Sequence, residues 1–264
     1  MSTATTTIGI LGLGEAGRLY ARGLAGAGAR VRGFDPHHSV ADAEIQQFDE
    51  LGDVLAGADA VLSLVGGRAA IEVAVQALPL LAAGTVYADL NTAGPDAKQQ
   101  IAGLARRADV PMADVAVLAP VPRAGHATPL LASGDGAVAL ATLLGPLGVP
   151  IDVVAGGAGE AARLRLLRSL FMKGLAALVL EGLGAARAAG AEDWLRAQME
   201  NELGPDGPAL IDRLVDGTYA HAERREHEVR VTLEMLEASG QPSDMTRATL
   251  AWLERVVDAR HTGR

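Results

Sequence analysis

Three glycines near the start of the chain have the spacing of a turn that binds phosphate. Gly12, Gly14 and Gly17 follow the apolar run 8–11, and the helix-compatible stretch 15–27 begins directly after Gly14. Backbone without a Cβ can turn tightly and approach a pyrophosphate, whose charge then lies over the N-terminus of the next helix. The segment therefore predicts a dinucleotide site. Its expected cofactor contacts are Gly12, Leu13, Gly14, Glu15, Ala16 and Gly17.

A carboxylate after the second apolar run supports this interpretation, because the glycine pattern alone is weak in a chain with 32 glycines. Asp35 follows the run 29–34 and stands 18 residues after the third glycine, close to the position of an acid that hydrogen-bonds the adenosine ribose diol. It favours NAD, since a carboxylate repels a 2′-phosphate. His37, His38 and Arg32 could offset that repulsion, so NADP stays an alternative.

Two later segments follow apolar runs that read as strands, 60–64 and 85–89. Open α/β sheets bind ligands at the carboxyl ends of their parallel strands. For the second segment the alternative is a plain polar turn before Pro95. The residues expected to line the cofactor here are Leu64, Val65, Asn91 and Thr92.

The stretch 159–189 reads as one long helix. A projection at about 100° per residue places Arg165, Ser169 and Lys173 on a polar stripe. That stripe could present two cations and a hydroxyl to an anionic substrate, or it could be a solvated face. Arg168 lies inside the apolar arc, as either a paired buried ion or a clamp for a substrate carboxylate. The apolar arc, expected to be the core stripe, comprises Leu164, Leu167, Phe171, Leu175 and Leu178.

One loop between two expected strands adds further substrate candidates. It contains Pro120, Arg123 and His126, near the cleft expected between the two halves of the chain. A single histidine such as His126 or His221 is more often a bystander than a proton carrier. The spacing of His, Asp and Glu suggests no metal site, and there is no nucleophile elbow.

The elements that would hold these residues divide the chain in two. The first half alternates β-type runs with helix-type stretches, typical of a parallel sheet wrapped by helices, and strand signals stop at Gly159. We expect an α/β fold, with a doubly wound Rossmann domain in residues 1–158 and an all-α substrate and dimerisation domain in 159–264. The expected strands are 6–11, 29–34, 60–64, 85–89, 111–117, 130–133 and 150–154.

The second half predicts helices only. Breaks are expected at Gly204-Pro205, at Gly217 and at 240–242, and one charged helix, 219–237, would carry His221. The apolar face of the long helix is too large for one small domain to cover. We therefore expect a homodimer whose C-terminal helices help to close each cleft.

Composition narrows the functional class. The net charge is −9 and only 3% of residues are aromatic, which argues against a nucleic-acid surface. There is no cysteine, the N-terminus does not resemble a signal peptide, and we expect charge to interrupt each apolar run before membrane-spanning length. We expect a cytoplasmic protein that acts on a small molecule and contacts neither nucleic acid nor membrane.

Together these residues resemble the β-hydroxyacid dehydrogenase superfamily, which includes 6-phosphogluconate and 3-hydroxyisobutyrate dehydrogenases, over nearly the whole chain. The resemblance rests on the three glycines, on 89–92 (Asp-Leu-Asn-Thr) and on 159–162 (Gly-Glu-Ala-Ala). The second half, with 163–169, Lys173-Gly174 and Glu181, is similar to the branch whose C-terminal domain resembles that of phosphogluconate dehydrogenase.

The resemblance implies a lysine on the long helix that moves a proton while hydride moves at the nicotinamide, and an asparagine four residues later that binds substrate. Arg165 and Ser169 stand at these positions, and a second register would choose Arg163. Arginine stays protonated and is a poor general acid or base. Lys173 is therefore the leading proton donor. The alternatives are His126, Tyr219, His221 and water.

A second departure lies at 118–120, Leu-Ala-Pro, where relatives with 3-hydroxyacid substrates carry Ser-Gly-Gly. It disfavours ordinary 3-hydroxyisobutyrate chemistry. The resemblance implies an NAD(P)-dependent oxidoreductase for a small hydroxy acid or its carbonyl counterpart. An imine reductase on the same fold and a regulatory protein that binds the nucleotide without turnover are the alternatives, and a methyltransferase is a weaker one.

Overall fold

The chain forms two compact units, and the boundary between them lies within a long helix. The computed structural model describes residues 5–40 and 45–262. Its contacts separate an N-terminal unit, residues 1–165, from a C-terminal unit, residues 166–264. The division lies within helix α6 (Glu160–Ala188), whereas the sequence suggested a boundary just before that helix.

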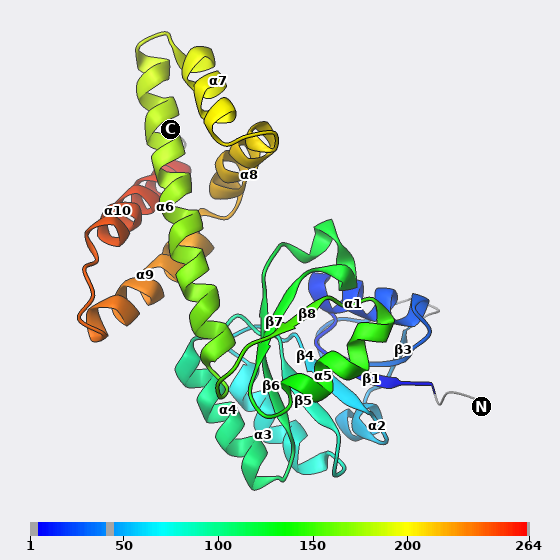
Figure 1. Ribbon diagram of the computed structural model, residues 1–264. Helices are drawn as coiled ribbons and strands as arrows, with labels where there is room; N and C mark the ends of the chain where they lie inside the picture. Colours follow the sequence, from blue (N-terminus) through cyan, green and yellow to red (C-terminus); the bar gives the residue numbers. More distant parts are fainter. Residues whose placement is uncertain (1–4, 41–44, 263–264) are drawn as a thin grey trace. The chain divides into compact units, whose positions relative to one another are not determined.

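An eight-stranded sheet forms the centre of the N-terminal unit (Figure 1). The strand order is β3-β2-β1-β4-β5-β6-β7-β8, and every neighbouring pair is parallel except β6 and β7. This doubly wound arrangement confirms the predicted fold class. The strands are β1 (Thr7–Leu11), β2 (Arg30–Phe34), β3 (Gln46–Gln47), β4 (Ala60–Ser63), β5 (Val86–Asp89), β6 (Met112–Val117), β7 (Leu130–Ser133) and β8 (Ile151–Val153).

Helices cover both faces of this sheet, which explains why its strands read as continuous apolar runs. Successive strand residues point to opposite faces, so Ile10 packs with Tyr20 and Leu24 on one side, while Leu11 packs with Ile101 on the other. The helices are α1 (Glu15–Gly26), α2 (Leu51–Leu55), α3 (Ala70–Ala77), α4 (Pro95–Arg107) and α5 (Ala137–Leu144), and the 3₁₀ turns are η1 (Leu78–Leu80), η2 (Val121–Arg123), η3 (Gly125–Ala127) and η4 (Gly145–Leu147).

The strand predictions are confirmed, because each expected strand forms with bounds within one residue of those predicted. β3 was missed. It consists of two glutamines and lacks the apolar alternation by which a strand is recognised. Gln47 nevertheless has a structural task, since its amide accepts from Val40 N at 2.8 Å and donates to His38 O at 2.8 Å.

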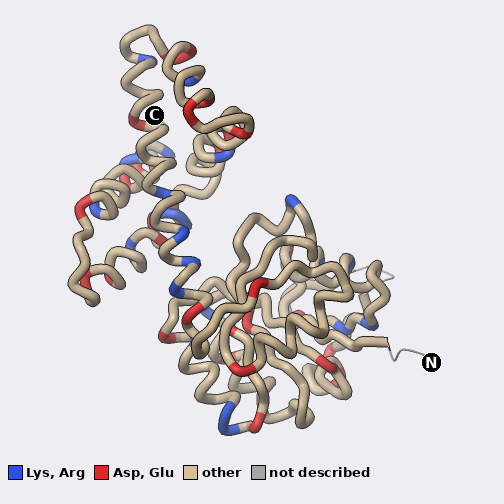
Figure 2. The backbone as a smooth tube through the Cα atoms, viewed as in Figure 1, with Lys and Arg blue, Asp and Glu red and all other residues tan. Residues whose placement is uncertain are grey.

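The C-terminal unit contains only helices in the part of the chain that the structure describes, as predicted, and acidic and basic residues are interspersed along them (Figure 2). The breaks at 204–205 and 240–242 are confirmed, but Gly217 lies inside a helix. A Cβ at Gly217 would approach the Arg225 guanidinium to 2.9 Å, so this glycine makes room for a side chain. The helices after α6 are α7 (Glu192–Glu202), α8 (Gly207–Ala220), α9 (Ala222–Ala238) and α10 (Asp244–Thr262).

Two details of these helices correct the sequence analysis. The expected charged helix 219–237 is divided, because α8 ends at Ala220 and α9 begins at Ala222, with His221 between them. The expected core stripe of α6 is also wrong for Leu167, Phe171 and Leu178, which are exposed, whereas Leu175 packs against the core of the C-terminal unit. Phe171 is 64% exposed and Leu178 is 62% exposed in the single chain.

The opposite side of α6 forms the core. Ala176, Val179 and Leu183 pack with Ile211 and Leu214 of α8. Apolar residues occur almost all round this helix, so its periodicity could not identify the buried side. Since Ser169 and Lys173 are buried, a solvated polar face is wrong for these two residues. Arg168 is exposed, so it is no buried ion.

By length and composition alone, α6 could cross a membrane. The expectation that charge interrupts every apolar run before spanning length is therefore wrong for this helix. Core helices of soluble proteins pass the same test, and α6 packs one side against α8 within the C-terminal unit.

Candidate functional site

The three glycines of the turn after β1 serve three different needs. Gly12 has a φ of +89°, and a Cβ there would lie 2.7 Å from the Leu64 carbonyl oxygen. A Cβ at Gly17 would lie 1.9 Å from the Gly12 carbonyl oxygen, so the helix could not pack against the turn. At Gly14 a Cβ would meet no atom of the described chain within 4 Å.

The open space at Gly14 lies at the N-terminus of α1. Gly14 is the N-cap residue, and no described side chain caps this helix end. Its first amide groups are left for another acceptor, and the helix dipole favours a negative one. The turn therefore fits the pyrophosphate of a dinucleotide, whereas a side chain at Gly14 would fill the approach. In the same loop Leu13 is buried, Ala16 is half-buried and Glu15 is exposed.

Asp35, at the end of β2, organises the adjoining loops. Its Oδ2 accepts from Leu13 N at 2.7 Å and faces His38 Nδ1 at 3.2 Å. Its Oδ1 accepts from His37 N at 2.8 Å and from His38 N at 3.0 Å. Burial raises the pKa of Asp35, but these hydrogen bonds outweigh burial and hold the pKa below its ordinary value. A carboxylate has about four acceptor positions, and all four are occupied here.

Arg32, one of the cations expected near this carboxylate, is engaged by the backbone of another segment. Its guanidinium donates to Asp53 O at 3.2 Å and to Ala56 O, and it lies 5.9 Å from the ring centre of Phe48. The side chain therefore holds the C-terminal end of α2. His37 and His38 are exposed and remain the candidates for contact with the adenosine end of a nucleotide.

The strand-end segments after β4 and β5 pack against each other. Asn91 Oδ1 accepts from Gly66 N at 2.7 Å, and its Nδ2 donates to Ser63 Oγ at 2.9 Å. A Cβ at Gly67 would lie 2.2 Å from Thr92 O, so these loops touch through their backbones. The Asn91 amide is thus committed to holding the loops. Thr92 is exposed, and the other two predicted contacts, Leu64 and Val65, are half-buried.

A buried ion cluster lies behind these loops, and sequence analysis missed it. Lys98 of α4 has its Nζ 3.1 Å from Asp89 Oδ2 and 3.4 Å from Asp114 Oδ1. Asp114 Oδ2 accepts from Gly159 N at 2.9 Å and from Ala162 N at 3.1 Å, so it caps α6. The sequence offered one signal for this cluster: Lys98 lies on the same face of its helix as Ile101 and Ala105, which are buried.

The three substrate contacts predicted in the loop after β6 lie in different surroundings. Pro120 and Arg123 are exposed. His126 packs on α1, because a Cβ at Gly23 would lie only 2.0 Å from His126 Nδ1. This glycine admits the imidazole to the helix surface, which gives His126 a packing role. Its role in substrate binding stays a prediction.

The C-terminal unit holds a second polar cluster. Lys173 Nζ lies 2.8 Å from Glu228 Oε2 of α9 and donates to Ser169 Oγ. The structure thus brings together two of the three residues of the predicted polar stripe, and Arg165 is half-buried. Glu228 was missed, because only the packing of α9 on α6 identifies it.

Glu228 also faces a second cation. Burial lowers the pKa of the Arg225 guanidinium, the charge of Glu228 raises it, and Arg224 lowers it again. Arg225 donates to Thr218 Oγ1 of α8 at 2.7 Å. The cluster therefore joins α6, α8 and α9. Within the residues that the structure describes, no group of three or more His, Asp or Glu side chains could hold a metal ion.

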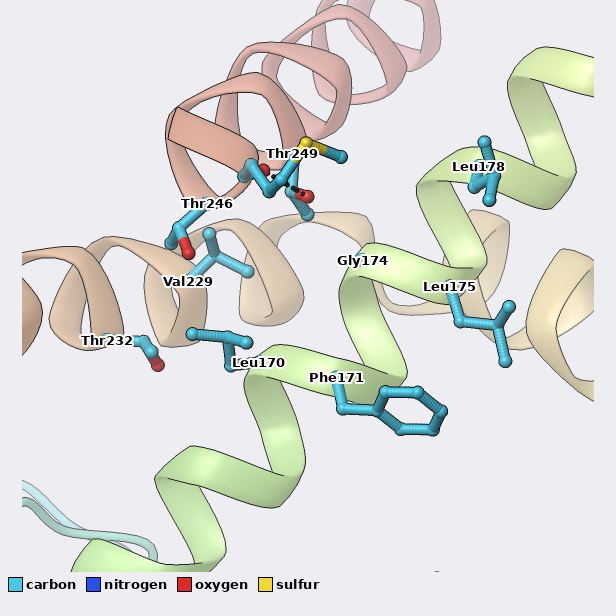
Figure 3. A pocket seen from close by; sticks show the side chains of 10 residues that line it. Leu170, Phe171, Gly174, Leu175, Leu178, Val229, Thr232, Thr246 and Thr249 are labelled. Carbon is cyan, nitrogen blue, oxygen red and sulfur yellow. Dashed lines mark hydrogen bonds between the residues drawn. The ribbon is translucent and has the colours of Figure 1, made fainter. Parts of the chain in front are cut away.

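Near this cluster, α6, α9 and α10 surround an apolar cavity of about 260 Å³ (Figure 3). Leu170 and Gly174 of α6 line it together with Val229 of α9 and Met245 of α10. The hydroxyls of Thr249 and Thr232 are turned to their own helices, where they donate to the carbonyls of Met245 and Glu228. The cavity consequently offers an apolar lining with few free polar groups.

Two families match the chain. Residues 7–144 match the family described as the NAD binding domain of 6-phosphogluconate dehydrogenase. Residues 186–256 match a domain of unknown function, DUF1932.

Relatives that are at least 30% identical include two proteins whose names give no function. An uncharacterised 28.5 kDa protein of Methanothermus fervidus is 30% identical over 185 residues, which is 70% of each chain. The crystal structure of a conserved hypothetical protein from Sinorhizobium meliloti is 32% identical, with a TM-score of 0.76, over 96% of this chain and 88% of that one.

More distant solved structures share the fold. A 3-hydroxyisobutyrate dehydrogenase from Salmonella typhimurium is 19% identical with a TM-score of 0.78, over 98% of this chain and 95% of that one. An imine reductase from Myxococcus stipitatus in complex with NAD⁺ is 19% identical with a TM-score of 0.69, over 97% of this chain and 94% of that one.

Proposed function

Because the chain belongs to the family of the NAD binding domain of 6-phosphogluconate dehydrogenase, we propose that it is an NAD(P)-dependent oxidoreductase. It would transfer a hydride between the nicotinamide and a small hydroxy acid or its carbonyl counterpart. When bound, the nucleotide supplies the hydride chemistry, and the protein supplies binding, orientation and charge.

The glycine turn is the observation that carries this proposal. The protein's own packing requires glycine at positions 12 and 17. At position 14 no atom of the described chain lies close enough to require a glycine. A ligand that approaches the backbone at the N-terminus of α1 explains that third glycine.

For the nucleotide, we propose NAD as the preferred form. The Asp35 carboxylate at the end of β2 would accept hydrogen bonds from a ribose diol and would repel a 2′-phosphate. Arg32, which could have balanced that repulsion, is held by Asp53 O and Ala56 O. His38 would have to release Asp35 Oδ2 before the diol could bind it, so His38 competes with NAD.

For proton transfer, we propose Lys173, with Glu228 as the carboxylate that orients its ammonium and Ser169 as a hydrogen-bond partner. A lysine ammonium can release a proton in the pH range in which enzymes work, whereas the guanidinium of Arg165 stays protonated there. Arg165 would bind the anionic group of the substrate and polarise its carbonyl. Further substrate contacts would come from Arg168, Arg123, Pro120 and His126.

An imine reductase is the second candidate. Arginine stands at the position where dehydrogenases of this fold carry lysine, and an imine reductase shares the fold. A regulatory protein that binds the nucleotide without turnover is the third. It would show nucleotide binding and no hydride exchange.

One experiment separates these candidates. NADH and NADPH are titrated into the protein by fluorescence, and turnover is then assayed over hydroxy acids, keto acids and cyclic imines. Turnover of hydroxy or keto acids supports the preferred function, and turnover of imines alone supports the second candidate. Failure to bind either nucleotide overturns all three.

A further inference from the structure

Lysine occurs at only two positions of this chain, Lys98 and Lys173, although 23 residues are lysine or arginine, which leaves 23 − 2 = 21 arginines. Both lysines are buried, with 1% and 8% of the residue exposed, and both pair with carboxylates. An ammonium is compact and tetrahedral, whereas a guanidinium is a planar fork. Because arginine is the usual cation of this chain, a lysine at a buried position indicates a site whose shape suits an ammonium better than a guanidinium.

At Lys98 three oxygens surround the ammonium. Its Nζ donates to Asp89 O at 2.6 Å and lies 3.1 Å from Asp89 Oδ2 and 3.4 Å from Asp114 Oδ1. Both carboxylate oxygens are buried, and within the described chain the Lys98 ammonium is the polar group that compensates them. The Lys98 charge therefore compensates two carboxylates whose burial would otherwise be costly.

On one side, this ammonium supports the loops of the nucleotide site. Asp89 Oδ1 accepts from Asn91 N at 3.1 Å and from Asn91 Nδ2. Asn91 Oδ1 in turn accepts from Gly66 N at 2.7 Å. The position of the loop after β4 thus depends on where Asp89 is held.

On the other side, the ammonium supports the first turn of α6. Asp114 Oδ2 accepts from the amides of Gly159 and Ala162, and Ser133 Oγ accepts from Ala161 N at 3.0 Å. A carboxylate at a helix N-terminus satisfies free amides and is favoured by the helix dipole. The contacts form one continuous series of hydrogen bonds and ion pairs from Gly66 to this turn.

We propose that Lys98 is a positioning residue of the nucleotide site. Its ammonium ties the loop held by Asn91 to the first turn of α6, so that nucleotide binding and the order of residues 159–165 are coupled. The proposal rests on the proposed nucleotide binding, and it assigns Lys98 no contact with the nucleotide itself.

The test uses the full chain and charge-matched variants. Lys98, Asp89 and Asp114 together carry a charge of −1, Lys98→Met changes it to −2, and Lys98→Met combined with Asp114→Asn restores −1. The single variant Asp114→Asn is the control for the change at the helix cap. Each protein is measured for melting temperature, for NADH and NADPH affinity, and for hydrogen exchange of residues 159–165 with and without nucleotide.

In the wild type we expect nucleotide to slow exchange in residues 159–165. Lys98→Met should melt at a lower temperature, and the double variant should recover much of this loss because its buried charge is restored. If Lys98 had only a structural role, the double variant would recover nucleotide affinity together with its melting temperature. We expect instead that nucleotide affinity stays reduced by about 5- to 150-fold, the range of typical coupling energies, and that exchange no longer responds. Asp114→Asn should keep the response.

Two results would overturn the positioning role: affinity within two-fold of the wild type in the double variant, or an exchange response that the double variant retains. A wild type that binds neither nucleotide overturns the proposed function instead. If Lys98→Met does not fold, ¹³Cε-lysine labelling of the wild type provides a second measurement. Its two lysine signals are assigned with Lys173→Met, and a Lys98 signal that does not shift on addition of nucleotide contradicts the proposal.

Discussion

At the scale of single residues, Asp35 and the two lysines show how neighbours decide what a charged group can do. Asp35 accepts three backbone amides and faces one imidazole, and the amides belong to the folded loops themselves. Only His38 is a side chain that can rotate away. The hydrogen bonds lower the pKa of Asp35, so the stability they contribute is present above its unfolded pKa and is lost as pH falls through the folded value.

His38→Ala should tighten NADH binding, because the ribose diol would no longer compete with the imidazole for Asp35 Oδ2. The loss of one hydrogen bond of about 1 kcal/mol corresponds to roughly five-fold in affinity. NADPH should gain less or bind more weakly, since a cationic partner for its 2′-phosphate is removed. His37→Ala, whose backbone amide still donates to Asp35, is the matched control. Equal ratios of the two affinities in both variants would contradict the assignment.

Lys173→Met should abolish turnover with little loss of nucleotide affinity, because the ammonium would act only on the proton of the substrate. Lys173→Met combined with Glu228→Gln removes both charges of the buried pair and guards against an unpaired carboxylate. Arg165→Ala should mainly raise KM. Steady-state kinetics on the substrate found by the screen measure both effects, and unchanged kinetics in Lys173→Met would remove it from the mechanism.

At the scale of elements, the turn between β1 and α1 is the part of the fold whose sequence and geometry agree most fully. Its apolar strand, its glycines and its helix were all recognisable locally, since each follows from backbone sterics and from a periodicity of neighbouring residues. The faces of α6 were not, because apolar residues surround it and only contact with α8 selects the buried side.

Gly14→Ala should leave folding almost unchanged, whereas Gly17→Ala should impair it. A Cβ at Gly14 meets no described atom, so this variant should melt within a few degrees of the wild type and lose nucleotide affinity at least ten-fold. A Cβ at Gly17 would collide with the Gly12 carbonyl, so Gly17→Ala should be strongly destabilised. Calorimetry and fluorescence titration check the pair. A Gly14→Ala variant that binds nucleotide normally would argue against the pyrophosphate at this turn.

At the scale of the whole molecule, the exposed apolar side of α6 supports the proposed homodimer. Phe171 and Leu178 are large, more than 60% exposed in the single chain, and border the cavity between α6, α9 and α10. Exposed apolar patches of this kind commonly mark interaction surfaces. A second copy of the chain is the partner that we propose for this surface.

Light scattering should therefore report a dimer at micromolar concentration. Phe171→Asp should shift it to a monomer, because burial of an unpaired carboxylate in an apolar interface is unfavourable. Trp194→Asp changes another exposed large side chain, on α7, and serves as the control. A monomeric wild type, or equal dissociation in both variants, would contradict the proposal.

The sequence by itself determined what depends on near neighbours: the strands of the sheet, the glycine turn, Asp35 after β2 and the change from α/β to all-helical structure. Only the tertiary structure decided that Lys98 joins two carboxylates, that Glu228 pairs with Lys173, and that α6 buries Ser169 and exposes Phe171. The physical reason is distance along the chain. Local sterics and periodicity act over a few residues, whereas burial and charge pairing depend on segments brought together by folding.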